Sequence, residues 1–140
     1  MIREFKPEDL SDIMRIWLDA NIQAHDFIEK EYWIANFDMV ESILPGAEVY
    51  VYEAEGEIKA FAGIDSGHIA GLFVAGRMQS MGIGKLLLDK CKELYSTLTL
   101  SVYEKNRRAV YFYKRAGFTV EKSRTDEKTG EDEYCMVWKK

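Results

Sequence analysis

The sequence predicts a single α/β (or α+β) domain in which helices pack on a mixed, mostly antiparallel twisted sheet. Three observations lead to this class. The chain of 140 residues is long enough for one core, because folding at this size removes about 68% of the unfolded surface from water. The apolar spacing changes several times between that of helices and that of strands. No linker, internal repeat or low-complexity segment divides residues 1–140, so one domain is expected.

The expected order of elements is β-α-α-β-β-β-α-β-α-β-β, with about seven strands and four helices. A short strand at 2–5 ends before Pro7, which together with two following acids marks a first helical turn. Apolar side chains then recur at three- and four-residue spacing over 10–20 and again over 33–44. This spacing predicts two consecutive amphipathic helices.

The middle of the chain changes to the pattern of strands. β-Branched and aromatic residues at 49–52 and 58–64, on either side of a turn at Glu55-Gly56, predict a hairpin. The run 69–74 is almost continuously apolar, which is typical of a central strand covered on both faces. The remaining elements are expected to be a helix over 86–94 after the stretch 76–84, a strand at 98–102, a helix at 106–116 stopped by Gly117, and closing strands at 118–123 and 134–138.

Composition limits the classes of partner. There are 19 Lys and Arg residues against 24 Asp and Glu, a net charge of −5. Because phosphate neutralisation needs clustered basic side chains, a nucleic-acid partner is not expected, and an amine-bearing partner suits the surface better. No run approaches the roughly 20 apolar residues of a membrane span, and the first 30 residues do not resemble a signal peptide. We therefore expect no membrane partner and a cytoplasmic location.

The two cysteines do not indicate a disulfide or a metal site. Cys91 lies in an apolar periodic segment and Cys135 in a strand-like one, with no Cys-x-x-Cys pattern and no clustering with histidine. Such spacing argues against a disulfide framework and against zinc. Two buried, reduced thiols and no metal are the expectation.

The stretch 79–85, Gln-Ser-Met-Gly-Ile-Gly-Lys, carries the strongest chemical signal. Glycines between a buried strand and a helix leave main-chain N–H groups free at the positive end of the helix dipole, which favours phosphate binding. A Walker A loop, Gly-x-x-x-x-Gly-Lys-Ser/Thr, does not fit. With Gly84-Lys85 as its Gly-Lys, Gln79 occupies the position of the first glycine and Leu86 that of the Ser/Thr. A dinucleotide fingerprint does not fit either, because its third glycine falls on Leu87.

Two motifs together resemble a known family. Gln79, Gly82 and Gly84 match the pattern Gln/Arg-x-x-Gly-x-Gly/Ala. The segment 106–118 matches Asn-x-x-Ala-x-x-Phe-Tyr-x-x-x-Gly-Phe position for position. With the order of elements over essentially the whole chain, these residues resemble the GNAT superfamily of N-acetyltransferases.

A narrower likeness involves the N-terminal helices. Trp17, the segment 24–28 and the segment 31–33 are similar to those of small stand-alone bacterial acetyltransferases, some of which modify lysine.

The resemblance implies a GNAT-like fold with a V-shaped opening between the strand ending near Val74 and the strand 98–102. Acetyl-coenzyme A is expected to lie in this opening. Main-chain N–H groups of 79–85 would hold its pyrophosphate, backbone near Phe73 and Val74 would bind the pantetheine and polarise the thioester carbonyl, and Asn106 would bind the pantetheine from the other side. The implied cofactor-binding residues are Phe73, Val74, Gln79, Met81, Gly82, Ile83, Gly84, Lys85 and Asn106.

Catalytic residues are implied less completely. Tyr113 matches the family's general acid, which protonates the leaving thiolate; otherwise it is an aromatic packed on the sheet. Ser101, which cannot serve as a comparable base, stands where several protein-acetylating members have a Glu. His25 is the candidate second catalytic residue, as a proton relay or substrate contact, with a structural role as the alternative. Glu104 and His68 are weaker candidates, more typical of a solvated loop acid and a surface histidine, and a water chain stays open.

Three further groups allow two interpretations each. The residues Trp17, Trp33 and Phe37 line an acceptor pocket or form core. The pair 107–108 contacts the cofactor's 3′-phosphate or is solvated. The acids within 126–133 form a solvated hairpin tip or attract a basic peptide.

The predicted function is an N-acetyltransferase that moves acetyl from acetyl-coenzyme A directly to a primary amine in a ternary complex. Neither cysteine has the surroundings of a nucleophile, which argues against a covalent intermediate. The acceptor is a protein lysine, an N-terminal amine or a small amine. The alternative is a non-catalytic acyl-coenzyme A-binding regulatory module, and monomer and homodimer both stay open.

Overall fold

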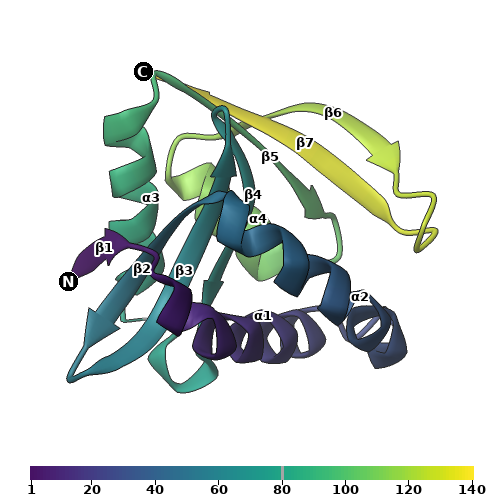
Figure 1. Ribbon diagram of the computed structural model, residues 1–140. Helices are drawn as coiled ribbons and strands as arrows, with labels where there is room; N and C mark the ends of the chain where they lie inside the picture. Colours follow the sequence, from purple (N-terminus) through teal and green to yellow (C-terminus); the bar gives the residue numbers. More distant parts are fainter. Residues whose placement is uncertain (80) are drawn as a thin grey trace.

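The computed structural model describes residues 1–79 and 81–140 and confirms the predicted order of elements (Figure 1). Boundaries agree with the predicted ones to within a few residues. The strands are β1 (Ile2–Glu4), β2 (Glu48–Ala54), β3 (Glu57–Asp65), β4 (His68–Val74), β5 (Thr97–Tyr103), β6 (Thr119–Thr125) and β7 (Asp132–Lys139). The helices are α1 (Leu10–Ala24), α2 (Lys30–Ile43), α3 (Ile83–Leu94) and α4 (Arg107–Arg115), with short 3₁₀ turns η1 (Pro7–Asp9), η2 (Leu44–Gly46) and η3 (Gly76–Met78).

The start of α1 is fixed by a charged side chain inside the fold. Asp9 is 5% exposed, and its carboxylate accepts hydrogen bonds from Arg3 Nη1 and from the main-chain N–H of Lys6, both at 2.8 Å. The Arg3 guanidinium also pairs with Glu53 on β2 at 2.8 Å. The bond from Arg3 lowers the pKa of the Asp9 carboxyl, so the pair is charged at neutral pH and ties β1, β2 and α1 together.

The strands form one mixed sheet in the order β1-β2-β3-β4-β5-β7-β6. In the described part of the chain, β4 and β5 run parallel to each other, whereas all other neighbouring strands are antiparallel. The β4–β5 pairing is short, with only His68 opposite Thr99 and Ile69 opposite Leu100. Beyond these residues the two strands part, as Figure 1 shows. The V-shaped opening expected from the family resemblance is thus present in the sheet.

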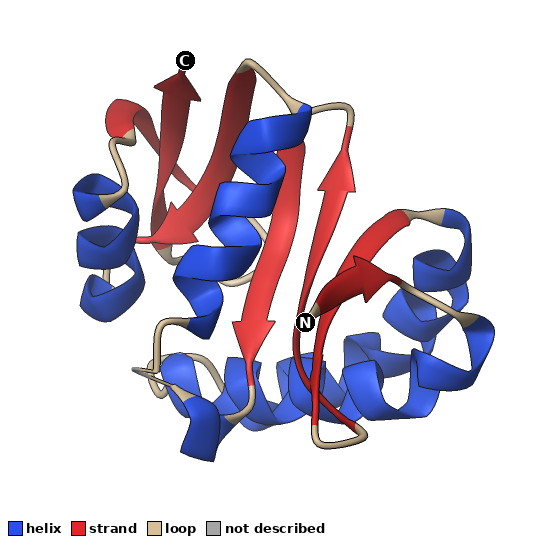
Figure 2. Cartoon of the chain, turned by 90° about the vertical axis from the view of Figure 1, so that its left-hand side faces the viewer, coloured by secondary structure: helices blue, strands red, loops and turns tan. Residues whose placement is uncertain are grey.

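Helices cover both faces of the sheet, and each face has its own core (Figure 2). On one face α3 and α4 pack through Leu87, Leu88 and Val110; on the other α1 and α2 pack through Ile13 and Trp33. Alternation along β3 supplies both cores, with Ala60, Ala62 and Ile64 on the α3 side and Phe61 on the α1 side.

Two expectations about burial are corrected by the structure. The run 69–74 was expected to be covered on both faces, but from Gly71 to Val74 the strand is only half-buried, because this part of β4 borders the opening; β3 is the strand buried on both faces. Cys91 is fully buried, whereas Cys135 is only partly buried, because its strand position opposite Ser101 faces the less covered side of the sheet. Both are free thiols.

Candidate active site

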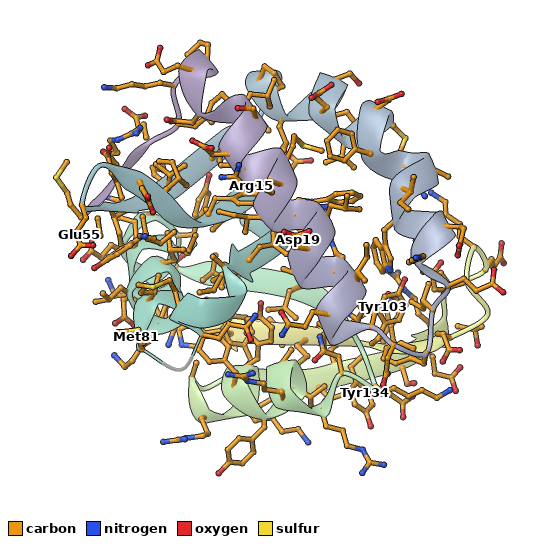
Figure 3. All side chains as sticks on the ribbon, turned by 90° about the horizontal axis from the view of Figure 1, so that it is seen from below. Arg15, Asp19, Glu55, Met81, Tyr103 and Tyr134 are labelled. Carbon is orange, nitrogen blue, oxygen red and sulfur yellow. The ribbon has the colours of Figure 1, made fainter. Side chains whose placement is uncertain are left out.

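A cleft of about 1410 Å³ lies where β4 and β5 separate. Its walls come from the second half of β4, the end of β5, the start of α3, one side of α4 and the C-terminal end of α1. In the view of Figure 3, Met81 lies on the α3 side and Tyr103 lies near the C-terminal end of α1, at opposite sides of this region. The cleft therefore joins the two faces of the sheet.

The glycine-containing loop gives α3 an uncapped start. Gly82 has a φ of 81°, a left-handed conformation that favours glycine, and it precedes the first helical residue, Ile83. Among the described residues no side chain caps this end, and free main-chain N–H groups at a helix start are suited to bind an anion. Gly82, Gly84 and Lys85 line the cleft. Ser80, within the predicted loop, lies outside the described residues.

Two loop residues predicted to bind the cofactor do not line the cleft with their side chains. Ile83 is 4% exposed, and its side chain is part of the core on the α3 side. Met81 is 66% exposed and points to the surface. Any contribution of these two residues to anion binding therefore comes from their main-chain N–H groups.

Gln79 links the loop to both flanking elements. Its Nε2 donates to the carbonyl oxygen of Val74 at 3.3 Å, and its Oε1 accepts a hydrogen bond from Arg108 Nη1 at 3.0 Å. The end of β4, the loop and the start of α4 are thereby tied at one end of the cleft. Basic side chains line the cleft along both α3 and α4: Lys85 and Lys92 come from α3, and Arg107, Arg108 and Arg115 from α4.

Tyr113 reaches the cleft from α4 but is 8% exposed. Its ring packs edge-on against Phe112 at 5.1 Å and Phe118 at 5.5 Å between centroids. Among the described residues no hydrogen bond involves its hydroxyl. Burial, with a smaller effect of the neighbouring Cys91 thiol, raises the pKa of Tyr113 well above its usual range, so the hydroxyl keeps its proton at neutral pH. Both proposals made from the sequence for Tyr113, a proton donor and a packed aromatic, are compatible with this position.

His25 and Asn106 meet across the cleft, which sequence analysis did not anticipate. Asn106 Nδ2 lies 3.2 Å from His25 Nε2, and His25 Nδ1 lies 3.0 Å from the carbonyl oxygen of Asn21. These contacts fit a neutral imidazole that donates through Nδ1 and accepts through Nε2. Burial lowers the pKa of His25, which favours the same neutral form. The other end of the Asn106 amide, Oδ1, caps α4 by accepting from the N–H of Ala109 at 3.3 Å.

Aromatic rings form the wall opposite the basic end. The His25 ring stacks on Trp33 at 5.1 Å and meets Tyr103 edge-on at 5.2 Å. Trp17 contacts Trp33 edge-on at 6.0 Å. Trp17 and Trp33 are less than one-tenth exposed and belong to the core, yet both also line the cleft. The two interpretations offered for these tryptophans thus hold together, whereas Phe37 packs against the core without lining the cleft.

A carboxylate that the sequence did not single out as a catalytic candidate lies at the aromatic end. Glu133 on β7 lines the cleft, and its side chain is 13% exposed. It pairs with Arg124 Nε at 2.7 Å, and Arg124 Nη2 also lies 3.2 Å from Ser101 Oγ. From the sequence, Glu133 belongs to the acids of the predicted hairpin tip, because the pairing of β7 with β5 that turns its side chain toward the cleft does not follow from local spacing.

The two weaker base candidates lie elsewhere. His68, exposed at the start of β4, contacts Thr99 Oγ1 at 2.8 Å, and Glu104 accepts a hydrogen bond from Ser123 at 3.2 Å. Neither lines the cleft. Within residues 1–79 and 81–140 no three His, Cys, Asp or Glu side chains are grouped as a metal site, and no helix there combines the length and apolarity needed to cross a membrane.

The mixed sheet that parts between β4 and β5, with a cleft at the gap, is the architecture of a class of acyltransferases. Residues 17–139 match the family described as "Acetyltransferase (GNAT) domain", and the chain belongs to this family of acetyltransferases. It is similar to the peptidyl-lysine N-acetyltransferase YiaC of Escherichia coli K12, with 32% identity over 140 residues that cover 99% of this chain and 96% of YiaC. The resemblance stated from the two sequence motifs is confirmed.

Solved structures agree with this assignment. The solution structure of apo YjaB from Escherichia coli has a TM-score of 0.88 and 28% identity, covering 99% of this chain and 96% of YjaB. The PaiA N-acetyltransferase of Thermoplasma acidophilum, solved with coenzyme A, has a TM-score of 0.83 and 20% identity over 100% of this chain and 98% of PaiA. The predicted GNAT-like fold is confirmed by these likenesses.

Proposed function

We propose that this acetyltransferase moves the acetyl group of acetyl-coenzyme A to the side-chain amine of lysine in a peptide or protein. The observation that carries the proposal is the cleft between β4 and β5, which opens to both faces of the sheet. Such an opening allows a donor on one face to meet an acceptor on the other without a covalent enzyme intermediate. The lysine acceptor is supported by the similarity to YiaC, which is named as a peptidyl-lysine N-acetyltransferase.

The α3–α4 side of the cleft fits the phosphate-bearing part of the donor. The uncapped start of α3 at Gly82 offers main-chain N–H groups, and basic side chains including Lys85 and Arg108 surround it. The edge of β4 that faces β5 has no strand partner beyond Ile69, so an extended pantetheine arm can lie along it as an added strand. When bound, acetyl-coenzyme A supplies an activated acyl group whose thiolate is the leaving group.

Tyr113 is the proposed proton donor to that thiolate. Its raised pKa keeps the hydroxyl protonated, and an apolar environment also makes a neighbouring thiolate more basic. The pKa values of the Tyr113 hydroxyl and of the leaving thiol are therefore both raised, so the difference between them stays small enough for proton transfer.

His25 is proposed to take part through Asn106. Both ring nitrogens of His25 are in contact with a hydrogen-bonding group. If Nε2 took up a proton it would become a donor facing the Asn106 Nδ2 donor, and the hydrogen bond between them would be lost. The histidine thus orients the Asn106 side chain, which caps the helix that carries Tyr113. This role agrees with the sequence-based placing of His25 and Asn106 at the active site while leaving proton acceptance to another group.

The proposal is tested by offering three matched peptides with acetyl-coenzyme A: one with a free lysine, one with that lysine replaced by arginine, and one with only a free N-terminal amine. Release of coenzyme A thiol is followed together with the mass and position of the added acetyl group. Acetylation at the lysine Nε alone is expected. Product at the N-terminal amine, or at small amines only, would contradict the lysine acceptor. Tight cofactor binding without any transfer would favour the non-catalytic regulatory module.

A further inference from the structure

Acyl transfer to lysine requires removal of a proton from an ammonium group, because the free side chain has a pKa of about 10.4. Among the described residues two carboxylates line the cleft, Asp89 and Glu133. Asp89 is on α3, on the basic side of the cleft, and pairs with Lys85 at 2.9 Å. Glu133 is on the opposite, aromatic side, where the acceptor is expected to enter.

The strand register directs Glu133 toward the acceptor side. Glu133 is opposite Tyr103 in the antiparallel β5–β7 pair, and side chains opposite each other share one face of the sheet. Ser101, two residues before Tyr103, shares that face. These residues lie on the same side as α1 and α2, whereas Leu100 and Val102 point into the core with α3. Tyr103 itself stands beside His25.

Arg124 holds the Glu133 carboxylate in place while leaving it able to accept another bond. Arg124 Nε donates to Glu133 Oε1, and the same guanidinium reaches Ser101 Oγ, so one side chain spans β6, β7 and β5. The Arg124 side chain is 53% exposed but that of Glu133 only 13%. A carboxylate has about four acceptor positions, so a second cation from the cleft has a place beside the first.

The surrounding groups give this end of the cleft a negative field. Tyr103 donates its hydroxyl to Asp126 at 2.6 Å. The pKa of Tyr32 on α2 is raised by burial and then by the charges of Asp126 and Glu133. The charged and titratable groups facing Glu133 are thus Arg124 from β6, Tyr103 from β5, Tyr32 from α2 and Asp126 from the hairpin connection. Two cations among the described residues belong to this end of the cleft: Arg124 pairs with Glu133, and Lys105, which lines the cleft before α4, pairs with Glu131 at 2.9 Å. Because each of these cations is matched by one carboxylate, Asp126 adds a further negative charge.

We propose that Glu133 is the catalytic carboxylate on the acceptor side, which binds the lysine ammonium and receives its proton before attack. This assignment rests on the proposed lysine acetyltransferase function. The ammonium gives one proton to Glu133 and becomes a neutral amine, and Glu133 passes that proton to water. The amine nitrogen then forms a bond to the acetyl carbon and loses its second proton, while the carbon–sulfur bond breaks and the thiolate takes a proton from Tyr113, which is replenished from solvent. The products are an acetylated lysine, coenzyme A thiol and one proton in solution.

The test compares Glu133→Gln with wild type in acetylation of a lysine peptide at pH 7.5 and near pH 10. At the lower pH almost all acceptor is protonated, so kcat/KM is expected to fall at least about 20-fold. Near pH 10 a sizeable share of the free amine is already neutral, and the difference is expected to shrink below about fivefold. Glu131→Gln is the matched control, because Glu131 is an ion-paired acid of the same hairpin, bound to Lys105 at 2.9 Å, that does not line the cleft. It is expected to stay within about twofold of wild type.

Acetyl-coenzyme A affinity and thermal unfolding of Glu133→Gln are measured alongside. A folded variant that binds the donor normally, yet shows no loss at pH 7.5 or an equal loss at both pH values, overturns the role of Glu133, as does an equal loss in Glu131→Gln. If Glu133→Gln does not fold, the double variant Glu133→Gln with Arg124→Gln, which leaves no unpaired charge, is judged by the same criteria. Absence of lysine acetylation in the wild type would instead reject the proposed function itself.

Discussion

Replacing Tyr113 by phenylalanine separates its chemical role from its packing role. The ring is 8% exposed between Phe112 and Phe118, and among the described residues its hydroxyl has no hydrogen-bond partner. Removing the hydroxyl leaves no donor or acceptor unsatisfied and creates almost no cavity, so the free energy of unfolding should change by less than about 1 kcal/mol. For a domain of this size that is a shift in Tm of at most about 4 °C.

The expected catalytic effect of Tyr113→Phe is much larger. A positioned general acid contributes about 10²–10⁴-fold, so kcat should fall at least 100-fold, or about 2.7 kcal/mol in activation free energy. The assay is thiol release at saturating acetyl-coenzyme A and lysine peptide, with the donor's Kd measured by calorimetry. Because the pKa of Tyr113 is raised, wild-type activity should show no decline from ionisation of this hydroxyl up to about pH 10.

Two results would refute this reasoning. Retention of more than about one-third of the wild-type kcat in Tyr113→Phe would mean that the thiolate leaves without this proton donor. A loss of activity that accompanies an equal loss of donor affinity and a large fall in Tm would mean that Tyr113 acts by packing alone. Phe118→Leu, which alters the packing around the same ring without removing the hydroxyl, is the comparison variant: it should lower Tm while retaining most of kcat.

Two further predictions concern the donor loop and the first helix. The side chain added by Gly82→Ala meets no neighbouring atom, but it stands on a residue with a φ of 81°, a conformation that costs about 1–2 kcal/mol for alanine. If acetyl-coenzyme A binds the α3 start in this conformation, the same cost lowers its affinity about tenfold, as measured by calorimetry. Unchanged affinity would exclude the α3 start as its site. The pKa of Asp9 is lowered in the folded state, so its contribution to stability is complete above the unfolded pKa of about 3.9 and is lost as pH falls through the lower folded value. Asp9→Asn should therefore lose about 2 kcal/mol at pH 7 in urea unfolding, and the difference from wild type should narrow in acid; a constant difference would mean that charge is not the cause.

The sequence was sufficient to predict the fold because its local signals agree with one another. Apolar spacing, the turn at Glu55-Gly56 and the helix stop at Gly117 each correspond to an element boundary within a few residues. Burial was predicted less well: the run 69–74 was expected to be fully buried but is not, and Cys135 is only partly buried. An apolar side chain at the wall of a cleft and one in a closed core look alike in sequence, so the half-buried state of this segment depends on where β5 leaves β4.

The site was predictable only where its residues follow one another in the chain. The loop 79–85 and the segment beginning at Asn106 are continuous motifs, and the residues of these motifs that line the cleft include Gln79, Gly82, Gly84, Lys85 and Asn106. The contact of His25 with Asn106 and the position of Glu133 depend on residues that are far apart in sequence. Glu133 looked like one more acid in a polar stretch, because nothing local shows that β7 lies next to β5 and not beside another strand.

The separation of β4 from β5 leaves main-chain groups without a strand partner, and polar side chains connect the two sides of the gap. Beyond Ile69, β4 stays paired with β3, but its main-chain groups that face β5 have no strand partner. Hydrogen bonds that a continuous sheet would have are therefore missing on that side. The two sides of the gap are instead connected by side chains: Gln79 joins the end of β4 to Arg108 of α4, and His25 of α1 meets Asn106 at the start of the same helix. These contacts connect the walls of the cleft at two places. An extended donor arm that bonds to the free edge of β4 would restore the missing partner, so binding of the donor should raise Tm through the same strands that the cleft leaves unpaired.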